Sequence, residues 1–158
     1  SKAGREALSA WRESKRLIDG AEAKFRVLDE LLRSYWGRRV IVFTNDNQTA
    51  YKISRRFLVP AITHQTDVKE RRGWLQKFES GELPILVTSR VLNEGVDLPS
   101  ANVAIVCSGS GTVREHVQRL GRILRPQEGK QAILIELVMA QTVEERTSRR
   151  RRDHVAYR

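Results

Sequence analysis

The sequence predicts an α/β fold, with a parallel β-sheet covered by helices on both faces. Five short runs rich in Val and Ile are mostly continuous in apolar character, which is typical of strands buried on both faces of a parallel sheet. Helical patterns lie between these runs, so strand and helix alternate along the chain, as they do in α/β proteins. The five expected strands lie within residues 40–45, 60–64, 84–89, 102–108 and 131–138.

The expected helices are recognised by apolar periodicity and by their end residues. Asp46 or Asn47 caps a helix that follows the first strand, and Thr66 with Asp67 opens another that stops at Gly81. Before the first strand, an amphipathic helix is expected to pack against the sheet. Its apolar residues recur at helical spacing, and they are Phe25, Leu28, Leu31, Leu32 and Tyr35.

We expect three parts along the chain. Residues 21–140 hold the α/β lobe. Residues 1–20 are basic and only loosely periodic, and form a linker or a helix from a preceding domain. Residues 141–158 are strongly basic and form a C-terminal helix or tail.

The composition favours an anionic partner. Lys and Arg number 29 against 19 Asp and Glu, which gives a net charge of +10. Nucleic acid is the commonest partner of so basic a domain. The alternative is a basic, solvated surface that keeps the protein soluble.

Other residue types exclude several classes of protein. The single cysteine, Cys107, lies in an apolar run, which indicates a buried thiol and excludes an internal disulfide. The three histidines show no metal-ligand spacing, so no metal site is expected within this chain. No run of about 18 apolar residues could span a membrane, and no signal peptide is present. We therefore expect an intracellular fragment, cytoplasmic at the nucleoid in a prokaryote or nuclear in a eukaryote.

A helix expected over residues 112–126 carries an unusual row of arginines. At 100° per residue one side is apolar and the opposite side displays an amide and three guanidinium groups. Gly121 costs such a helix about 1 kcal/mol relative to Ala, which favours a close approach to the backbone there. The alternative is a solvated arginine face. The apolar residues are Val113, Val117, Leu120 and Leu124, and the polar ones are Gln118, Arg119, Arg122 and Arg125.

A second stretch, residues 88–99, follows an expected strand and precedes the next. It therefore lies at the carboxyl end of a parallel strand, where open α/β sheets bind ligands. Thr88 and Ser89 supply hydroxyls, Gly95 a flexible backbone and Asp97 a carboxylate that could accept hydrogen bonds from ribose. An ordinary turn would explain the Gly-x-Asp-x-Pro pattern equally well.

Together, TSRVLNEGVDLP and QRLGRILRP resemble motifs V and VI of superfamily 2 helicases, and VIVFTND falls where motif IV of those proteins lies. The order and spacing resemble the second RecA-like lobe over about residues 20–140. The stretch SGSGTVREHVQRLGRILRP and the tail ERTSRRRRDHVAY are similar to the XPB family of DNA repair helicases. The resemblance implies a RecA-like parallel sheet and an ATP-driven DNA motor.

The chain lacks the phosphate-binding loop G-x-x-x-x-G-K-[ST], and no Asp-Glu pair follows a strand. In the resembled family those parts belong to the first lobe, and ATP binds between the lobes. The resemblance thus implies that ATP with Mg is bound mainly by a first lobe outside this sequence. It also implies DNA, the first lobe of the same protein, and a repair nuclease or a transcription-repair assembly as partners, with no membrane.

The same resemblance assigns roles to individual residues. Gln118, Arg122 and Arg125 match motif VI positions that face the γ-phosphate, the two arginines as arginine fingers, and Gly95 and Asp97 match motif V positions near the nucleotide. A further set matches positions that contact the backbone of the tracked strand. These are Thr44, Asn45, Thr88 and Ser89.

Some alternatives stay open. Arg119 could pair with a carboxylate inside the lobe, and the arginines of residues 149–152 could contact DNA or end a helix that docks a partner. The chain could also be a catalytically silent RecA-like nucleic-acid-binding module. A third alternative is the motor lobe of another superfamily 2 enzyme.

Overall fold

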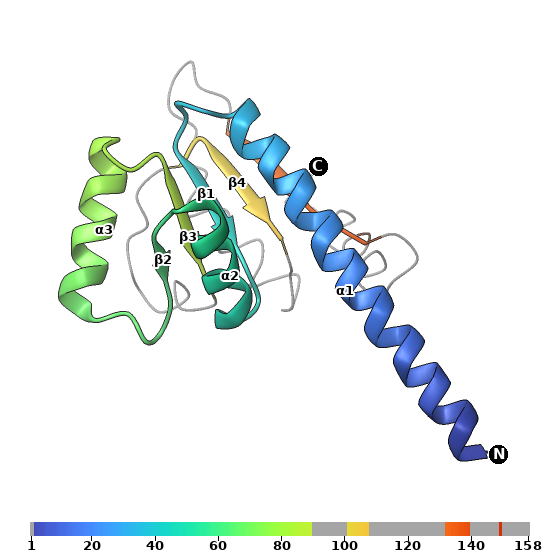
Figure 1. Ribbon diagram of the computed structural model, residues 1–158. Helices are drawn as coiled ribbons and strands as arrows, with labels where there is room; N and C mark the ends of the chain where they lie inside the picture. Colours follow the sequence, from blue (N-terminus) through green and yellow to red (C-terminus); the bar gives the residue numbers. More distant parts are fainter. Residues whose placement is uncertain (1, 90–100, 108–131, 140–148, 150–158) are drawn as a thin grey trace.

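The computed structural model describes residues 2–89, 101–107, 132–139 and 149, and for residues 12–20 it describes the backbone alone. This part of the chain forms a sheet flanked by helices (Figure 1). The helices are α1 (Lys2–Ser34), α2 (Asn47–Phe57) and α3 (Val68–Ser80). The strands are β1 (Val40–Phe43), β2 (Ala61–Ile62), β3 (Ile85–Thr88), β4 (Val103–Val106) and β5 (Ile133–Glu136).

The five strands form one parallel sheet in the order β2-β3-β1-β4-β5. All four residues of each central strand, β3, β1 and β4, are buried. That burial explains why their sequences are apolar without alternation, because both faces of the sheet are covered. Each expected apolar run contains one of the strands, so the expected parallel sheet is confirmed.

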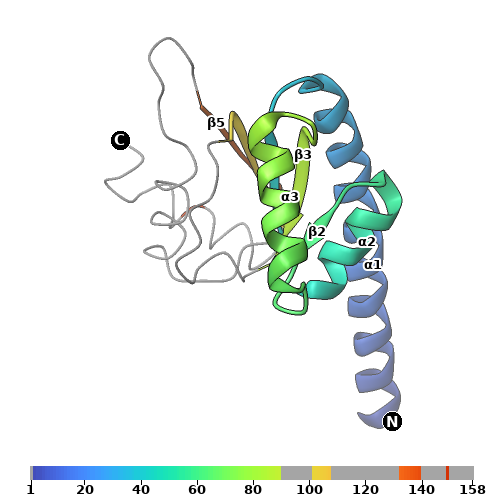
Figure 2. The same ribbon diagram turned by 90° about the vertical axis from the view of Figure 1, so that its left-hand side faces the viewer.

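Helices cover both faces of the sheet, as expected. On one face, α1 and α2 pack against alternate residues of β1, β3 and β4, including Val40 and Val42. The other face is covered by α3 (Figure 2). Its Phe78, Trp74 and Leu75 pack against the remaining residues of the same strands. The helix expected over residues 112–126 lies outside the described residues.

The ends of α2 and α3 are set by the residues expected from the sequence. The Asp46 carboxylate accepts a hydrogen bond from the Thr49 amide at 2.8 Å and caps α2. Asp67 accepts from the Lys69 and Glu70 amides and caps α3. Helix α3 ends at Gly81, whose φ of 82° is left-handed and therefore favours glycine.

Helix α1 contains the expected amphipathic segment. Leu28 and Leu32 are buried against the sheet, and Phe25, Leu31 and Tyr35 pack around them. The helix is continuous from Lys2 to Ser34, so no helix end coincides with the expected boundary at residue 20. Its N-terminal part projects beyond the sheet (Figure 1), where residues 2–11 are exposed. Within the described residues, no helix is long and apolar enough to cross a membrane.

Candidate nucleic-acid and nucleotide-binding edge

The parallel strands bring distant segments together at one edge of the sheet, which we call the carboxyl edge. It is formed by the residues that follow β1, β2, β3 and β4. Three backbone hydrogen bonds continue the sheet pairing into this edge, from Thr44 N to Thr88 O at 2.9 Å, from Ser89 N to Ile62 O at 3.2 Å and from Cys107 N to Phe43 O at 2.9 Å. Ligands of open α/β sheets bind at such an edge.

The structure brings together Thr44, Thr88 and Ser89, three of the four residues matched to DNA contacts. They follow or end the neighbouring strands β1 and β3, and all three are buried. The Thr44 hydroxyl donates to Asp46 O at 2.9 Å and the Thr88 hydroxyl to Ser89 O at 3.0 Å, so both stabilise the strand ends. The Ser89 hydroxyl is buried and has no hydrogen-bond partner among the described residues. Contact of these residues with DNA stays a prediction.

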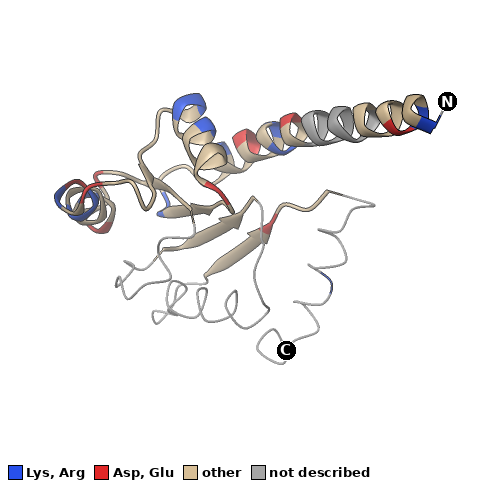
Figure 3. Cartoon of the chain, turned by 90° about the horizontal axis from the view of Figure 1, so that it is seen from below, with Lys and Arg blue, Asp and Glu red and all other residues tan. Residues whose placement is uncertain are grey.

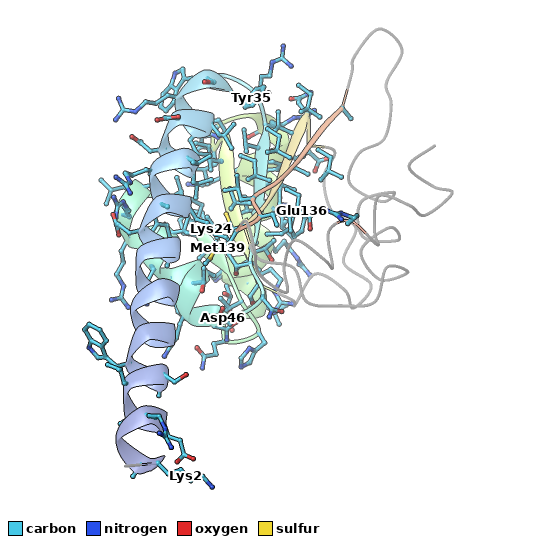
Figure 4. The ribbon with its side chains drawn as sticks, turned by 90° about the vertical axis from the view of Figure 1, so that its right-hand side faces the viewer. Lys2, Lys24, Tyr35, Asp46, Glu136 and Met139 are labelled. Carbon is cyan, nitrogen blue, oxygen red and sulfur yellow. The ribbon has the colours of Figure 1, made fainter. Side chains whose placement is uncertain are left out.

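The start of α2 supplies polar groups to the same edge, and Asn45, the fourth matched residue, lies between β1 and the N-cap residue Asp46. Asp46 lies at the lower end of the sheet in Figure 4. Its carboxylate accepts hydrogen bonds from both the amide and the hydroxyl of Thr49, each at 2.8 Å. Asn47 lies 2.8 Å from His64, measured from the amide nitrogen Nδ2 to the ring nitrogen Nδ1. This contact joins α2 to the segment after β2.

The segment after β2, residues 63–67, is the β2–α3 turn. Two of its hydrogen bonds are local, with Thr63 N donating to the Thr66 hydroxyl at 2.9 Å and Thr66 N donating to Thr63 O at 3.1 Å. The Arg71 guanidinium reaches back to the carbonyl oxygens of Thr63 and Thr66 at 3.4 and 3.5 Å. The sequence analysis did not identify this turn as part of the candidate site. The signal that could have found it is its position, because it is a polar segment that directly follows an expected parallel strand.

Lys24 of α1 also reaches the carboxyl edge. Its ammonium group donates to Cys107 O at 2.8 Å, so it caps the end of β4 (Figure 4). This contact joins α1 to β4, the strand that precedes residues 112–126 in the sequence. The Cys107 side chain itself is buried, as expected.

Positive charge in the described part lies mainly on the helices, with Arg38 and Arg39 in the connection between α1 and β1. Figure 3 shows Lys and Arg on α1, α2 and α3, whereas the five strands contain none. Among the residues that the structure describes, no group of three or more His, Cys, Asp or Glu side chains could hold a metal ion.

The remaining candidate residues lie outside the described residues. These are the motif V and motif VI candidates Gly95, Asp97, Gln118, Arg119, Arg122 and Arg125, together with the apolar set Val113, Val117, Leu120 and Leu124. Their arrangement therefore stays a prediction. Ser89 and Cys107, the last described residues before these two stretches, both lie at the carboxyl edge.

Comparison with known proteins decides the family. Residues 23–127, more than half of the chain, match the family described as helicase conserved C-terminal domain. This chain belongs to that family. The helicase C-terminal domain shares its fold with the solved C-terminal domain of the DEAD-box protein Dbp5, at a TM-score of 0.72 and 21% identity over 82% of this chain and 76% of that one. At that identity the likeness shows the fold alone.

Curated relatives of this helicase C-terminal domain confirm the resemblance to the XPB family. It is 49% identical over 152 residues to DNA 3'-5' translocase XPB2 of Sulfurisphaera tokodaii, which covers 96% of this chain and 34% of that protein. It is 39% identical over 116 residues to DNA 3'-5' helicase XPB of Kineococcus radiotolerans, covering 73% of this chain and 21% of that protein. The chain thus spans about a third or less of the length of these relatives.

Proposed function

We propose that this chain is the second motor lobe of an ATP-dependent DNA helicase or translocase that acts in DNA repair of the nucleotide excision type. The observation that carries the proposal is the 49% identity to a DNA 3'-5' translocase, which extends over nearly the whole chain. The missing phosphate loop fits a lobe that works with another part of a longer protein.

ATP with Mg would be bound mainly by the first lobe and would complete its site against the carboxyl edge of this one. Gln118, Arg122 and Arg125 would face the γ-phosphate, while Gly95 and Asp97 would lie near the nucleotide. Phosphoryl transfer depends mainly on positioning and charge stabilisation, and an arginine finger is worth about 10³–10⁵ in rate in GTPases. Arginine suits this role because its planar guanidinium stays charged and binds phosphate oxygens in pairs.

DNA would cross the same edge. Thr44, Asn45, Thr88 and Ser89 are the proposed contacts, and the clustering of β1 and β3 ends supports their acting on one strand. The Ser89 hydroxyl is buried and has no partner among the described residues, so it is the group in this set best suited to form a hydrogen bond with a ligand. Opening and closing of the two lobes with each ATP would then move these contacts along DNA.

The cellular setting and partners belong to the same proposal. A relative from Trypanosoma brucei, 36% identical over 91 residues, is named as the XPB helicase/translocase subunit of the TFIIH basal transcription factor complex. That name supports a transcription-repair assembly as partner, with a repair nuclease as the alternative. We place the protein inside the cell, at the nucleoid of a prokaryote or in the nucleus of a eukaryote.

The test uses the complete protein and its DNA-stimulated ATPase. Arg122→Ala and Arg125→Ala should each lower kcat by orders of magnitude and leave DNA affinity and thermal stability nearly unchanged, because a finger acts on transition-state charge. Arg72→Ala removes an exposed arginine of α3 and serves as the matched control. Loss of stability and activity in proportion would contradict the finger assignment. A complete protein without DNA-stimulated ATPase would favour the silent binding module.

A further inference from the structure

Helix α2 ends at a leucine whose backbone and exposure are both unusual. Leu58, its C-cap residue, has φ 54° and ψ 43°, which is the left-handed region. The other residues with positive φ in the described part of the chain are glycines, Gly37 and Gly81. Leu58 is also 91% exposed, more than any other large hydrophobic side chain among the described residues. Within the lobe, neither the backbone conformation nor the exposure favours a leucine at this position.

The fold explains the backbone of this residue but not its side chain. The residues on either side, Phe57 and Val59, both pack against the core, so the chain changes direction at residue 58. Ser54 holds this turn, since its carbonyl oxygen accepts from the amides of Leu58 and Val59 and its hydroxyl donates to Val59 O at 2.6 Å. Glycine or asparagine would adopt the same conformation more readily. The leucine side chain therefore needs a reason outside the packing of the lobe.

The outer face of α2 that leads to Leu58 is basic. Lys52 and Arg55 are exposed on this face, and α2 contains no Asp or Glu. Figure 3 shows this end of the helix in blue. Other basic side chains on the described helices have carboxylate partners, as Arg33 has in Asp29 at 3.1 Å, whereas Lys52 and Arg55 have no ion pair among the described residues. Two neighbouring cations without a carboxylate repel each other until an anionic group pairs with them.

Contacts with α1 hold this end of α2 in place. The Arg56 guanidinium lies 2.9 Å from a carboxylate oxygen of Glu22 and 5.4 Å from the centre of the Phe25 ring. The surface formed by Lys52, Arg55 and Leu58, which we call the α2 surface, is therefore fixed on the lobe. Helix α2 begins at the carboxyl edge, and its 11 residues span about 16 Å. Leu58 thus lies well away from the proposed nucleotide and DNA contacts.

The chemistry of the α2 surface favours a protein that is both acidic and apolar where it makes contact. Carboxylates would pair with Lys52 and Arg55, while an apolar pocket would remove Leu58 from water. Nucleic acid would satisfy the two cations but would offer phosphates and sugars to the leucine. A second copy of this chain would bring a net charge of +10 against another +10, which opposes self-association.

We propose that the α2 surface is a docking site for a protein partner that presents Asp or Glu side chains around an apolar pocket. Leu58 fills the pocket, and Lys52 and Arg55 pair with the carboxylates at its border. The inference goes beyond the proposed function, because neither ATP hydrolysis nor movement on DNA uses this surface. It gives the lobe a place to bind another protein while the carboxyl edge is occupied.

The first test is photocrosslinking of the complete protein in the cells to which it belongs. The substitution Leu58→p-benzoylphenylalanine places the crosslinking group at the centre of the α2 surface. Mass spectrometry should find it joined to a protein segment in which Asp and Glu outnumber Lys and Arg. The control is Val68→p-benzoylphenylalanine, at an exposed apolar position of α3 on the opposite face of the sheet, which should not capture that segment.

The second test measures the affinity of the purified complete protein for the partner that crosslinking identifies. Leu58→Asn suits the left-handed backbone and should weaken binding by about tenfold to a hundredfold, the worth of burying one leucine side chain. Arg55→Glu should weaken binding strongly at low salt and less at high salt, because salt screens the repulsion that it introduces. Val68→Asn should bind like the unaltered protein.

Several results would overturn the inference. They are a crosslink at position 58 no stronger than at position 68, a crosslink to nucleic acid, to a basic segment or to a second copy of this chain, and an unchanged affinity in Leu58→Asn. The outcome is independent of the motor activity. Leu58→Asn and Arg55→Glu should keep the DNA-stimulated ATPase of the unaltered protein, and absence of that ATPase in the unaltered protein would contradict the proposed function alone.

Discussion

The docking of α1 on the sheet can be tested with two neighbouring residues. Leu28 is fully buried in the core that α1 shares with β1, β3 and β4, whereas Val27 beside it is 43% exposed. Leu28→Ala removes a buried isobutyl group and leaves a cavity, which costs about 2–5 kcal/mol. Val27→Ala removes a partly solvated group from a helix that favours alanine, so its effect should lie within about 0.5 kcal/mol.

The assay is urea denaturation of the 158-residue chain, followed by helical circular dichroism. A thermal melt of the same chain gives a second measure. For a domain of this size each kcal/mol of lost stability lowers the melting temperature by about 2–4 °C, so a loss of about 3 kcal/mol lowers it by roughly 6–12 °C. The denaturation midpoint should fall for Leu28→Ala and hardly move for Val27→Ala. Equal effects of the two variants, or a loss below about 1 kcal/mol for Leu28→Ala, would refute the packing of α1 described above.

Three further predictions concern the same chain. Without a phosphate loop it should show no ATPase activity with or without DNA, and DNA-stimulated turnover by the purified chain would contradict the proposed division between two lobes. It should bind DNA weakly and without sequence preference, with an affinity that falls steeply as salt rises; a flat salt dependence would mean that the +10 charge is only a solvated surface. Asp67→Ala should destabilise the chain by about 1 kcal/mol in urea by removing the cap of α3, while Asp67→Asn should be nearly neutral, and equal losses would argue against the cap.

Local patterns were sufficient for the positions of the strands and for three of the helix ends. Continuous Val and Ile runs marked the buried strands, because a parallel sheet covered on both faces needs apolar side chains at every position. Asp46, Asp67 and Gly81 marked helix ends, because the unpaired amides and the left-handed backbone at those ends demand particular residues. The run at residues 60–64 produced only the two-residue strand β2, since it lies at the sheet edge and pairs with β3 alone.

The carboxyl edge depended on tertiary structure. Thr44 and Thr88 are 44 positions apart, Asn47 and His64 are 17 apart, and Lys24 and Cys107 are 83 apart, yet each pair is joined by a hydrogen bond. The burial of the Thr44 and Thr88 hydroxyls likewise could not be read from the pattern that matched them to DNA contacts.

Neighbouring residues alone were enough to predict an α/β lobe with a helicase-like pair of motifs, because periodicity, capping and motif spacing are local properties of the sequence. Which strands are neighbours, and therefore which polar side chains meet where the strands end, follows from the packing of the whole fold. Strand order follows from how all helices and strands pack at once, and the same apolar runs would suit several orders. For that reason the contacts of His64 and Gln65 with α2 could not be predicted from the sequence. They exist because β2 pairs with β3 and one face of α2 lies beside the turn that follows β2.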